Sequence, residues 1–164
     1  MHGSGAVPVS KTNRDTSRTD DHGLKTEFFV WGSDKHGALG QNSGKKKYAA
    51  PRPCYFVGAE SVKQVSCGDQ HMIILTTDGL VYSCGNNSGK QLGIKGPDLK
   101  IPTLIESLVF SSEIQNRVIE VCCANSFSLA VTASGLVFAW GTNLYGAMGL
   151  GRQLTSVDSP TLIA

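Results

Sequence analysis

The chain has 164 residues, of which 19 are glycine and 17% are charged, and its formal net charge is +2. Because globular proteins average roughly 7% glycine and about 25% charged residues, this composition disfavours a helical bundle and favours short strands joined by glycine turns. The length predicts one domain, and so small a net charge does not by itself indicate a dedicated nucleic-acid or membrane binder.

The first part of the chain, residues 1–27, is rich in Ser, Thr, Asp, Arg and Gly and poor in large apolar side chains. It predicts a disordered N-terminal arm ahead of one folded domain over residues 28–164. No stretch approaches the roughly 18 continuous apolar residues of a membrane helix. The five cysteines form no CxxC pair, and most of them lie in apolar runs. We therefore predict an intracellular protein, cytoplasmic or nuclear, with no membrane partner.

Three segments of the domain align with one another without a gap. They begin at Trp31, Cys84 and Trp140, each followed by glycine, and the spacings are 53 and 56 residues. A second pair of segments, residues 65–76 and 121–132, repeats with the same offset of 56 residues. Self-similarity at a fixed period indicates a repeat architecture in which each repeat is one supersecondary unit.

Each repeat predicts four short strands, the first of which ends at the Trp-Gly or Cys-Gly pair. The second is expected to follow a proline, and the fourth turns back through Asp78-Gly79 or Ser134-Gly135, which signals a tight hairpin. Four antiparallel strands in roughly 50 residues match a propeller blade. We predict an all-β, incomplete β-propeller of about two and a half blades. The predicted second strands are Pro53–Val57, Pro102–Glu106 and Pro160–Ile163. The third strands are Val62–Cys67 and Val118–Cys123, and the fourth are His71–Thr76 and Phe127–Thr132.

The repeated pattern Val-x-x-Val-x-Cys-Gly-x-x-His, Leu-Thr-x-Asp-Gly and Trp-Gly-x-Asn-x-x-Gly-x-Leu-Gly resembles the repeat of the regulator of chromosome condensation family. The resemblance covers residues 28–164 and implies a seven-bladed propeller. Departures from the pattern at Cys84, Lys90, Ala124 and Phe127 leave the register intact. Resemblance implies guanine nucleotide exchange on a small Ran-like GTPase, or chromatin docking. It also implies an interaction platform joined to a kinase, ubiquitin-ligase or ciliary module.

Most of the repeated residues have an architectural explanation. Glycines at strand ends and loop ends are expected where the backbone is crowded or φ is positive, and the two tryptophans are expected to pack between blades. His71 lies near Asp69 and Cys67, but its repeat equivalent is Phe127, which favours a space-filling residue over a catalyst or metal ligand. The structural repeat positions are Trp31, Gly32, Gly40, Gly68, His71, Gly79, Gly85, Gly93, Gly135, Trp140, Gly141 and Gly149.

Catalysis and cofactor binding find little support in the sequence. The stretch Gly85–Gln91 has three residues between its glycines and no Ser or Thr after Lys90, so it does not match a phosphate-binding P-loop. No acid pair, complete triad or four-ligand metal spacing occurs. We predict no catalytic residue, no metal and no cofactor, with an enzyme site at the propeller centre as the least favoured alternative.

The charges gather in one loop of each repeat, and equivalent loops of a propeller emerge on one face. Residues 41–53, 94–101 and 150–159 together carry a net charge of +5, which leaves −3 for the rest of the chain. Such a rim is expected to dock an acidic partner, whereas the alternative is an ordinary solvated lysine run. The candidate partner-binding residues are Lys45, Lys46, Lys47, Arg52, Lys95, Lys100 and Arg152.

The leading functional prediction is a non-catalytic protein-interaction module, with a small GTPase as one partner. Chromatin or nucleic-acid docking through the basic rim and a structural part of a larger multidomain protein are the alternatives. The exchange activity of the family cannot be carried over, because the one longer connection, Ser107 to Arg117, matches no exchange hairpin convincingly. Two and a half blades leave open strand edges, so self-association or additional repeats are expected to complete the ring.

Overall fold

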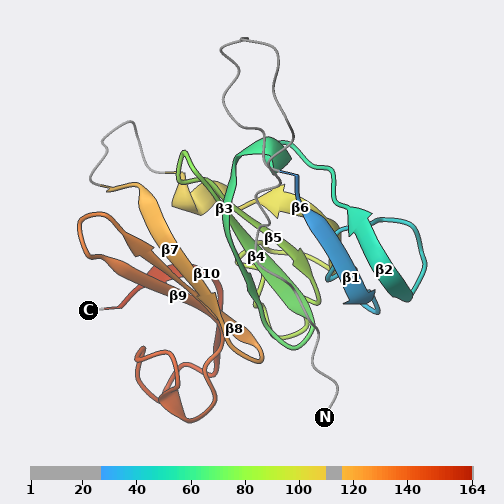
Figure 1. The fold of residues 1–164 in the computed structure, drawn as a ribbon. Coiled ribbons are helices and arrows are strands. Elements are labelled where there is room, and N and C mark those ends of the chain that lie inside the picture. Colours follow the sequence, from blue (N-terminus) through green and yellow to red (C-terminus); the bar gives the residue numbers. More distant parts are fainter. Residues whose placement is uncertain (1–26, 110–115, 164) are drawn as a thin grey trace, which may run out of the picture.

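The computed structural model describes residues 27–109 and 116–163, and the regular structure of these segments is almost entirely β-strand (Figure 1). The predicted disordered arm lies, but for Glu27, outside the described residues. The strands are β1 (Phe29–Ser33), β2 (Lys47–Pro53), β3 (Val62–Cys67), β4 (His71–Thr76), β5 (Val81–Gly85), β6 (Leu99–Leu104), β7 (Val118–Cys123), β8 (Phe127–Thr132), β9 (Val137–Thr142) and β10 (Ser156–Leu162). The helical elements among the described residues are the single turns η1 (Ala59–Ser61), η2 (Glu106–Leu108) and η4 (Leu144–Gly146).

The strands form three antiparallel sheets in chain order: β1-β2, β3-β4-β5-β6 and β7-β8-β9-β10. The two four-stranded sheets are complete blades, and β1-β2 is half of one, so the prediction of about two and a half propeller blades is confirmed. Each sequence repeat is divided between two sheets. The repeat that starts at Trp31, for example, supplies β1 and β2 to one blade and β3 and β4 to the next.

The predicted third and fourth strands of the repeats are confirmed residue for residue as β3, β4, β7 and β8. The predicted starts of the second strands are wrong, because β2, β6 and β10 begin several residues before the expected prolines. Each of these three strands lies at the outer edge of its sheet and contains a proline where the pairing register shifts. An edge strand tolerates proline because no neighbouring strand on its outer side needs the missing N–H as a donor. The three equivalent prolines are Pro51, Pro102 and Pro160.

The apolar core lies between neighbouring blades, in two clusters. Met72, Ile74 and Tyr82 of the middle blade pack in a cluster that also contains Phe28 and Val30 near the start of the domain. The opposite face of the middle blade packs on the third blade, and its cluster contains Ile73, Leu75, Val81, Val118, Val121, Ala130 and Trp140. Every residue of β4 and β5 is buried, because this blade is covered on both faces.

Candidate functional site

The loops that follow β1, β5 and β9 leave the same, lower end of the three blades (Figure 1). Each loop begins with an Asp or Asn whose side-chain oxygen accepts a hydrogen bond from the backbone N–H five residues later. The acceptor and donor pairs are Asp34 and Leu39 at 2.9 Å, Asn87 and Leu92 at 3.2 Å, and Asn143 and Met148 at 2.9 Å. This shared brace gives the three loops a common shape, and what differs among them is the side chains that they present.

Neighbouring repeats are joined by a donor at the Trp-Gly position. The Nε1–H of Trp140 donates to the carbonyl oxygen of Gln91 at 2.9 Å, and the thiol of Cys84 donates to that of Ala38 at 3.6 Å. Trp140 is fully buried, and Gly93 lies so close that a Cβ there would approach Trp140 Nε1 to 2.8 Å. Trp31 is half-buried, because it lies in the half blade.

His71 belongs to the same inter-blade network. Its Nε2–H donates to Ser128 Oγ at 2.9 Å, and the Ser128 hydroxyl donates to the Gln91 carbonyl, also at 2.9 Å. Nδ1 is buried without a hydrogen-bond partner among the described residues. Burial lowers the pKa of His71 to about 4, so the ring is neutral near pH 7. Among the described residues, no group of three or more His, Cys, Asp and Glu side chains is placed to hold a metal ion.

The predicted glycine positions fall at turns and tight contacts. Gly68 has an ordinary φ but packs directly against the His71 ring. The other predicted glycines have positive φ, as expected for these strand ends and loops: Gly32, Gly40, Gly79, Gly85, Gly93, Gly135, Gly141 and Gly149.

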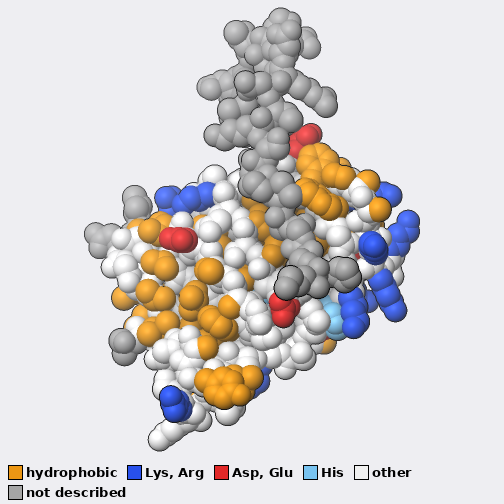
Figure 2. All heavy atoms as spheres, turned by 60° about the horizontal axis from the view of Figure 1, so that its bottom comes forward, with side chains coloured by type: hydrophobic (Ala, Val, Ile, Leu, Met, Phe, Trp, Pro, Cys, Tyr) orange, Lys and Arg blue, Asp and Glu red, His pale blue; other side chains and the backbone are white. Residues whose placement is uncertain are grey.

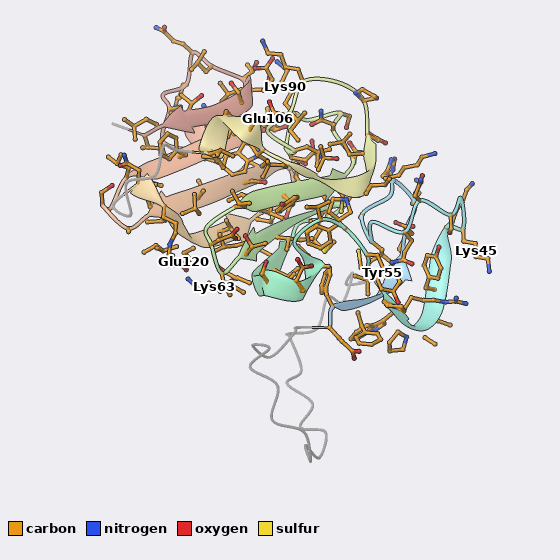
Figure 3. All side chains as sticks on the ribbon, turned by 90° about the horizontal axis from the view of Figure 1, so that it is seen from above. Lys45, Tyr55, Lys63, Lys90, Glu106 and Glu120 are labelled. Atoms are coloured by element: carbon orange, nitrogen blue, oxygen red, sulfur yellow. The ribbon has the colours of Figure 1, made fainter. Side chains whose placement is uncertain are left out.

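Three of the predicted basic residues come together around one hollow. Lys45, Lys46 and Lys100, together with Lys35, line a cavity of about 200 Å³ between the β1–β2 loop and the start of β6. We call these four residues and the cavity the lysine hollow. Figure 2 shows basic side chains gathered at one edge of the molecule beside a histidine, and Figure 3 places Lys45 at the outer side of the first blade.

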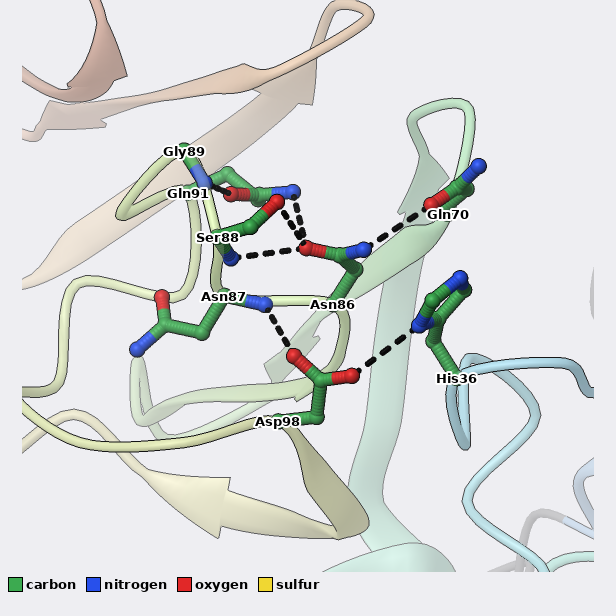
Figure 4. Close-up of polar contacts among 8 residues, drawn as sticks. All are labelled: His36, Gln70, Asn86, Asn87, Ser88, Gly89, Gln91 and Asp98. Atoms are coloured by element: carbon green, nitrogen blue, oxygen red, sulfur yellow. Dashed lines mark hydrogen bonds and ion pairs between the residues drawn. The ribbon is translucent and has the colours of Figure 1, made fainter.

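The walls of the lysine hollow are tied to each other. Asn42 N–H donates to the carbonyl oxygen of Lys100 at 3.2 Å, and Gly37 packs against the Lys100 backbone. His36 Nδ1 lies 3.0 Å from Asp98 Oδ2, and the other Asp98 oxygen accepts the Asn87 N–H at 2.8 Å (Figure 4). Both carboxylate oxygens of Asp98 therefore already have partners inside the wall.

The remaining members of the predicted rim lie away from the hollow lining. Lys47 is exposed on β2, and the Arg52 guanidinium lies 5.8 Å from the centre of the Tyr48 ring. Lys95 Nζ approaches an Asp158 carboxylate oxygen at 3.9 Å, which offsets its charge, and Arg152 is exposed on the β9–β10 loop. The structure thus divides the predicted rim into a cluster of lysines and separate single charges.

Sequence reasoning missed Lys35 because the residues aligned with it are Ser88 and Leu144, so the repeat gives it no distinguishing pattern. Lys35 also precedes the basic segment 41–53 on which the predicted rim depends. Lys35 joins the lysine hollow because the loop folds back on itself between the Asp34 brace and β2.

No helix of the described segments is long and apolar enough to cross a membrane.

Comparison with known proteins places these repeats among relatives that are much longer. The chain is 35% identical over 125 residues to human HERC4, which is named as a probable E3 ubiquitin-protein ligase. The alignment covers 76% of this chain and 11% of that protein. It is 39% identical over 129 residues to the secretion-regulating guanine nucleotide exchange factor of Bos taurus, covering 77% of this chain and 26% of the relative. The chain therefore spans a minor part of either relative.

Solved structures show the same arrangement of blades. Human WBSCR16 superposes with a TM-score of 0.73 at 27% identity, over 84% of this chain and 35% of that one. Prp20p from Saccharomyces cerevisiae, whose structure was described with its binding to Gsp1p and histones, superposes with a TM-score of 0.72 at 22% identity, over 85% and 34% of the two chains.

Two family descriptions, both of the regulator of chromosome condensation (RCC1) repeat, match the chain. One matches residues 27–75 and 78–131, and the other matches residues 62–91 and 118–147. The first covers more than half of the chain, and its matched segments contain the loops that follow β1 and β5. The chain belongs to the RCC1 repeat family, and its repeats form part of a β-propeller that serves as a protein-interaction module.

Proposed function

We propose that this chain is a non-catalytic docking module that binds an acidic surface of a protein partner through the lysine hollow. The supporting observation is the convergence of four lysines from two successive repeats on one cavity. Asp98, one of the two aspartates that line the cavity, is already engaged by His36 and Asn87. A concentrated positive charge of this kind steers acidic partners and sets their orientation.

A small Ran-like GTPase is the first partner to test. The proposal is supported by a relative named as a guanine nucleotide exchange factor, to which 77% of this chain aligns. Exchange itself would be seen as faster release of a fluorescent GDP analogue from the GTPase when the chain is added. Binding without faster release would assign docking and not exchange to these repeats.

Chromatin is the second candidate, because lysine ammonium groups also pair with DNA phosphates. The description of Prp20p with histones supports testing this partner. Nucleosomes and free DNA offered at the same salt concentration separate histone contacts from DNA contacts. The third candidate, a scaffold role within a larger ligase, is supported by the likeness to human HERC4.

The decisive experiment reverses the charge of two lysines of the hollow, Lys45 and Lys46, and of Lys47 beside them on β2. The variant Lys45→Glu, Lys46→Glu, Lys47→Glu changes the net charge of the chain from +2 to −4. The matched control Lys90→Glu, Lys95→Glu, Arg152→Glu makes the same change with exposed residues that do not line the hollow. We expect the first variant to weaken partner binding at low salt by about tenfold or more and the control by about threefold or less.

Binding by the parent chain should also weaken as salt rises, because exposed charges are screened over roughly 10 Å at 0.1 M ionic strength. Equal loss in the two variants would mean that only the overall charge matters. Unchanged binding in the first variant would place the docking surface outside the lysine hollow.

A further inference from the structure

The lysine hollow is a more specific feature than a basic surface, because lysines from two repeats surround one small concave volume. Four lysines line a cavity of about 200 Å³, and no arginine is among the described residues that line it. Lysine binds phosphate and carboxylate as a point charge, without the bidentate geometry that arginine offers to both. Four point charges around a small volume therefore favour a compact ligand that carries more than one negative charge.

The net charge of the lining supports the same ligand. Four lysines and two aspartates, Asp34 and Asp98, line the cavity, which gives +2 when His36 is neutral. Burial raises the pKa of Asp34, and the Leu39 N–H donates to its carboxylate. A phosphate monoester carries about −1.5 to −2 at pH 7, so it would neutralise this lining in one step.

The cavity is also built in advance of any ligand. The turn at residues 42–44 is fixed by the hydrogen bond between the Ser43 and Tyr48 hydroxyls, and Tyr48 is buried. The opposite wall is fixed by the contacts of Asp98 and Lys100 described above. A site whose walls are held in place loses less conformational entropy when it binds.

We propose that the lysine hollow binds the phosphate group of a phosphorylated serine or threonine in the docking partner. This inference rests on the proposed function and narrows it from acidic proteins to phosphoproteins. A nucleic-acid strand fits less well, because a strand needs positive charge along its length. Beyond the hollow the basic residues are dispersed. Lys47 and Arg52 lie on β2, Lys95 Nζ lies 3.9 Å from an Asp158 oxygen, and Arg152 lies on a separate loop.

The test uses the full chain and a short fluorescent peptide that carries one phosphoserine among glycine and alanine residues. Its controls are the unphosphorylated peptide and a peptide with glutamate in place of phosphoserine. We expect the dissociation constant of the phosphopeptide to be at least about tenfold lower than that of either control peptide. Amide chemical shifts of Gly37 and of residues 42–46 should move on binding.

Variants at the cavity make the test specific. Lys35→Ala combined with Lys100→Ala should weaken phosphopeptide binding by about tenfold, whereas Lys90→Ala with Lys95→Ala should change it by about twofold or less. Equal binding of the three peptides, or equal loss in the two double variants, would overturn the proposal. Vesicles containing a phosphoinositide, and inorganic phosphate alone, are offered in parallel. Binding to either without binding to the phosphopeptide would also overturn it.

The two proposals fail in different ways. If the charge reversal at Lys45, Lys46 and Lys47 removes binding to an acidic partner but phosphorylation brings no gain, the docking function stands and the phosphoprotein specificity falls. If the phosphopeptide binds at the hollow but the charge reversal leaves partner binding unchanged, the anion site stands and the docking function falls.

Discussion

The buried, neutral His71 should make the stability of this domain sensitive to mild acid. Its pKa in the folded chain is lowered to about 4, whereas an unfolded chain protonates near 6.5. Below about pH 6.5 the unfolded state therefore binds more protons at this residue than the folded state does, and folding stability falls with pH until about pH 4. Integrated between pH 7 and pH 5, the loss is about 2 kcal/mol.

The repeat itself supplies the variant that tests this reasoning. Phenylalanine occupies the equivalent position in the next repeat, at Phe127, so His71→Phe is a substitution that the fold already uses. The variant loses the hydrogen bond to Ser128, at a cost of about 1 kcal/mol at pH 7. It should also lose most of the pH dependence between pH 7 and pH 5.

Urea unfolding followed by circular dichroism at pH 7, 6 and 5 measures both quantities. The difference between parent and variant isolates the histidine from the carboxylates, which titrate in both proteins. If the two proteins lose the same free energy of unfolding between pH 7 and pH 5, His71 is protonated in the folded state and the burial argument is wrong.

Further predictions concern the inter-blade contacts and the thiols. Gly93→Ala should lower the free energy of unfolding by about 2 to 4 kcal/mol, because φ is +70° and the new Cβ would press on Trp140. Gly135→Ala, with open space around it, should lower it by about 1 kcal/mol. Equal losses in thermal unfolding would contradict the contact argument. Gln64→Glu should destabilise the fold by about 1 to 3 kcal/mol, since the Gln64 amide donates to the Val121 carbonyl at 2.8 Å and a carboxylate cannot donate. In the same assay, Glu120→Gln at the exposed repeat-equivalent position should change stability by less than about 0.5 kcal/mol. In the native chain the exposed Cys122 should react with a thiol reagent at pH 8 well before the other four cysteines, because burial raises their pKa values. Those four are Cys54, Cys67, Cys84 and Cys123. Simultaneous modification of all five would refute this assignment.

The sequence predicted the fold well wherever the repeat aligned with itself. The strands β3, β4, β7 and β8 were found at their predicted residues, because these segments recur with the same offset of 56 residues and the Asp-Gly or Ser-Gly turn marks the ends of β4 and β8. The predicted starts of β2, β6 and β10 are wrong because the proline that the prediction places first lies inside the strand or, in β2, at its end. At an outer edge, proline interrupts pairing without ending the strand, and position in the sheet is a property that a single sequence does not display.

The candidate site was only partly predictable for a similar reason. The run Lys45 to Lys47 marks itself by local charge, and the structure brings Lys45 and Lys46 together with Lys100. Lys35 lies ten residues before Lys45 in the chain and carries no repeat signal, so only the fold of the loop places the two in one cavity. Conversely, Lys95 Nζ lies 3.9 Å from a carboxylate oxygen of Asp158 in β10, so a lysine of one repeat faces an acid of the next, which the separate loops do not show.

The division of each repeat between two sheets determines where the chain can be cut and rejoined. A break in the hairpin Thr77–Leu80 separates β3 and β4 from β5 and β6, so each fragment would carry half of the middle blade. A break in the connection between Leu104 and Val118 would leave both four-stranded sheets whole. The contacts of β3 and β4 with β7, and the bonds of His71 and Trp140 described above, would then reunite them. Fragments cut at the hairpin would thus complement each other through the backbone hydrogen-bond ladder of one sheet, and fragments cut at the connection mainly through contacts that involve side chains.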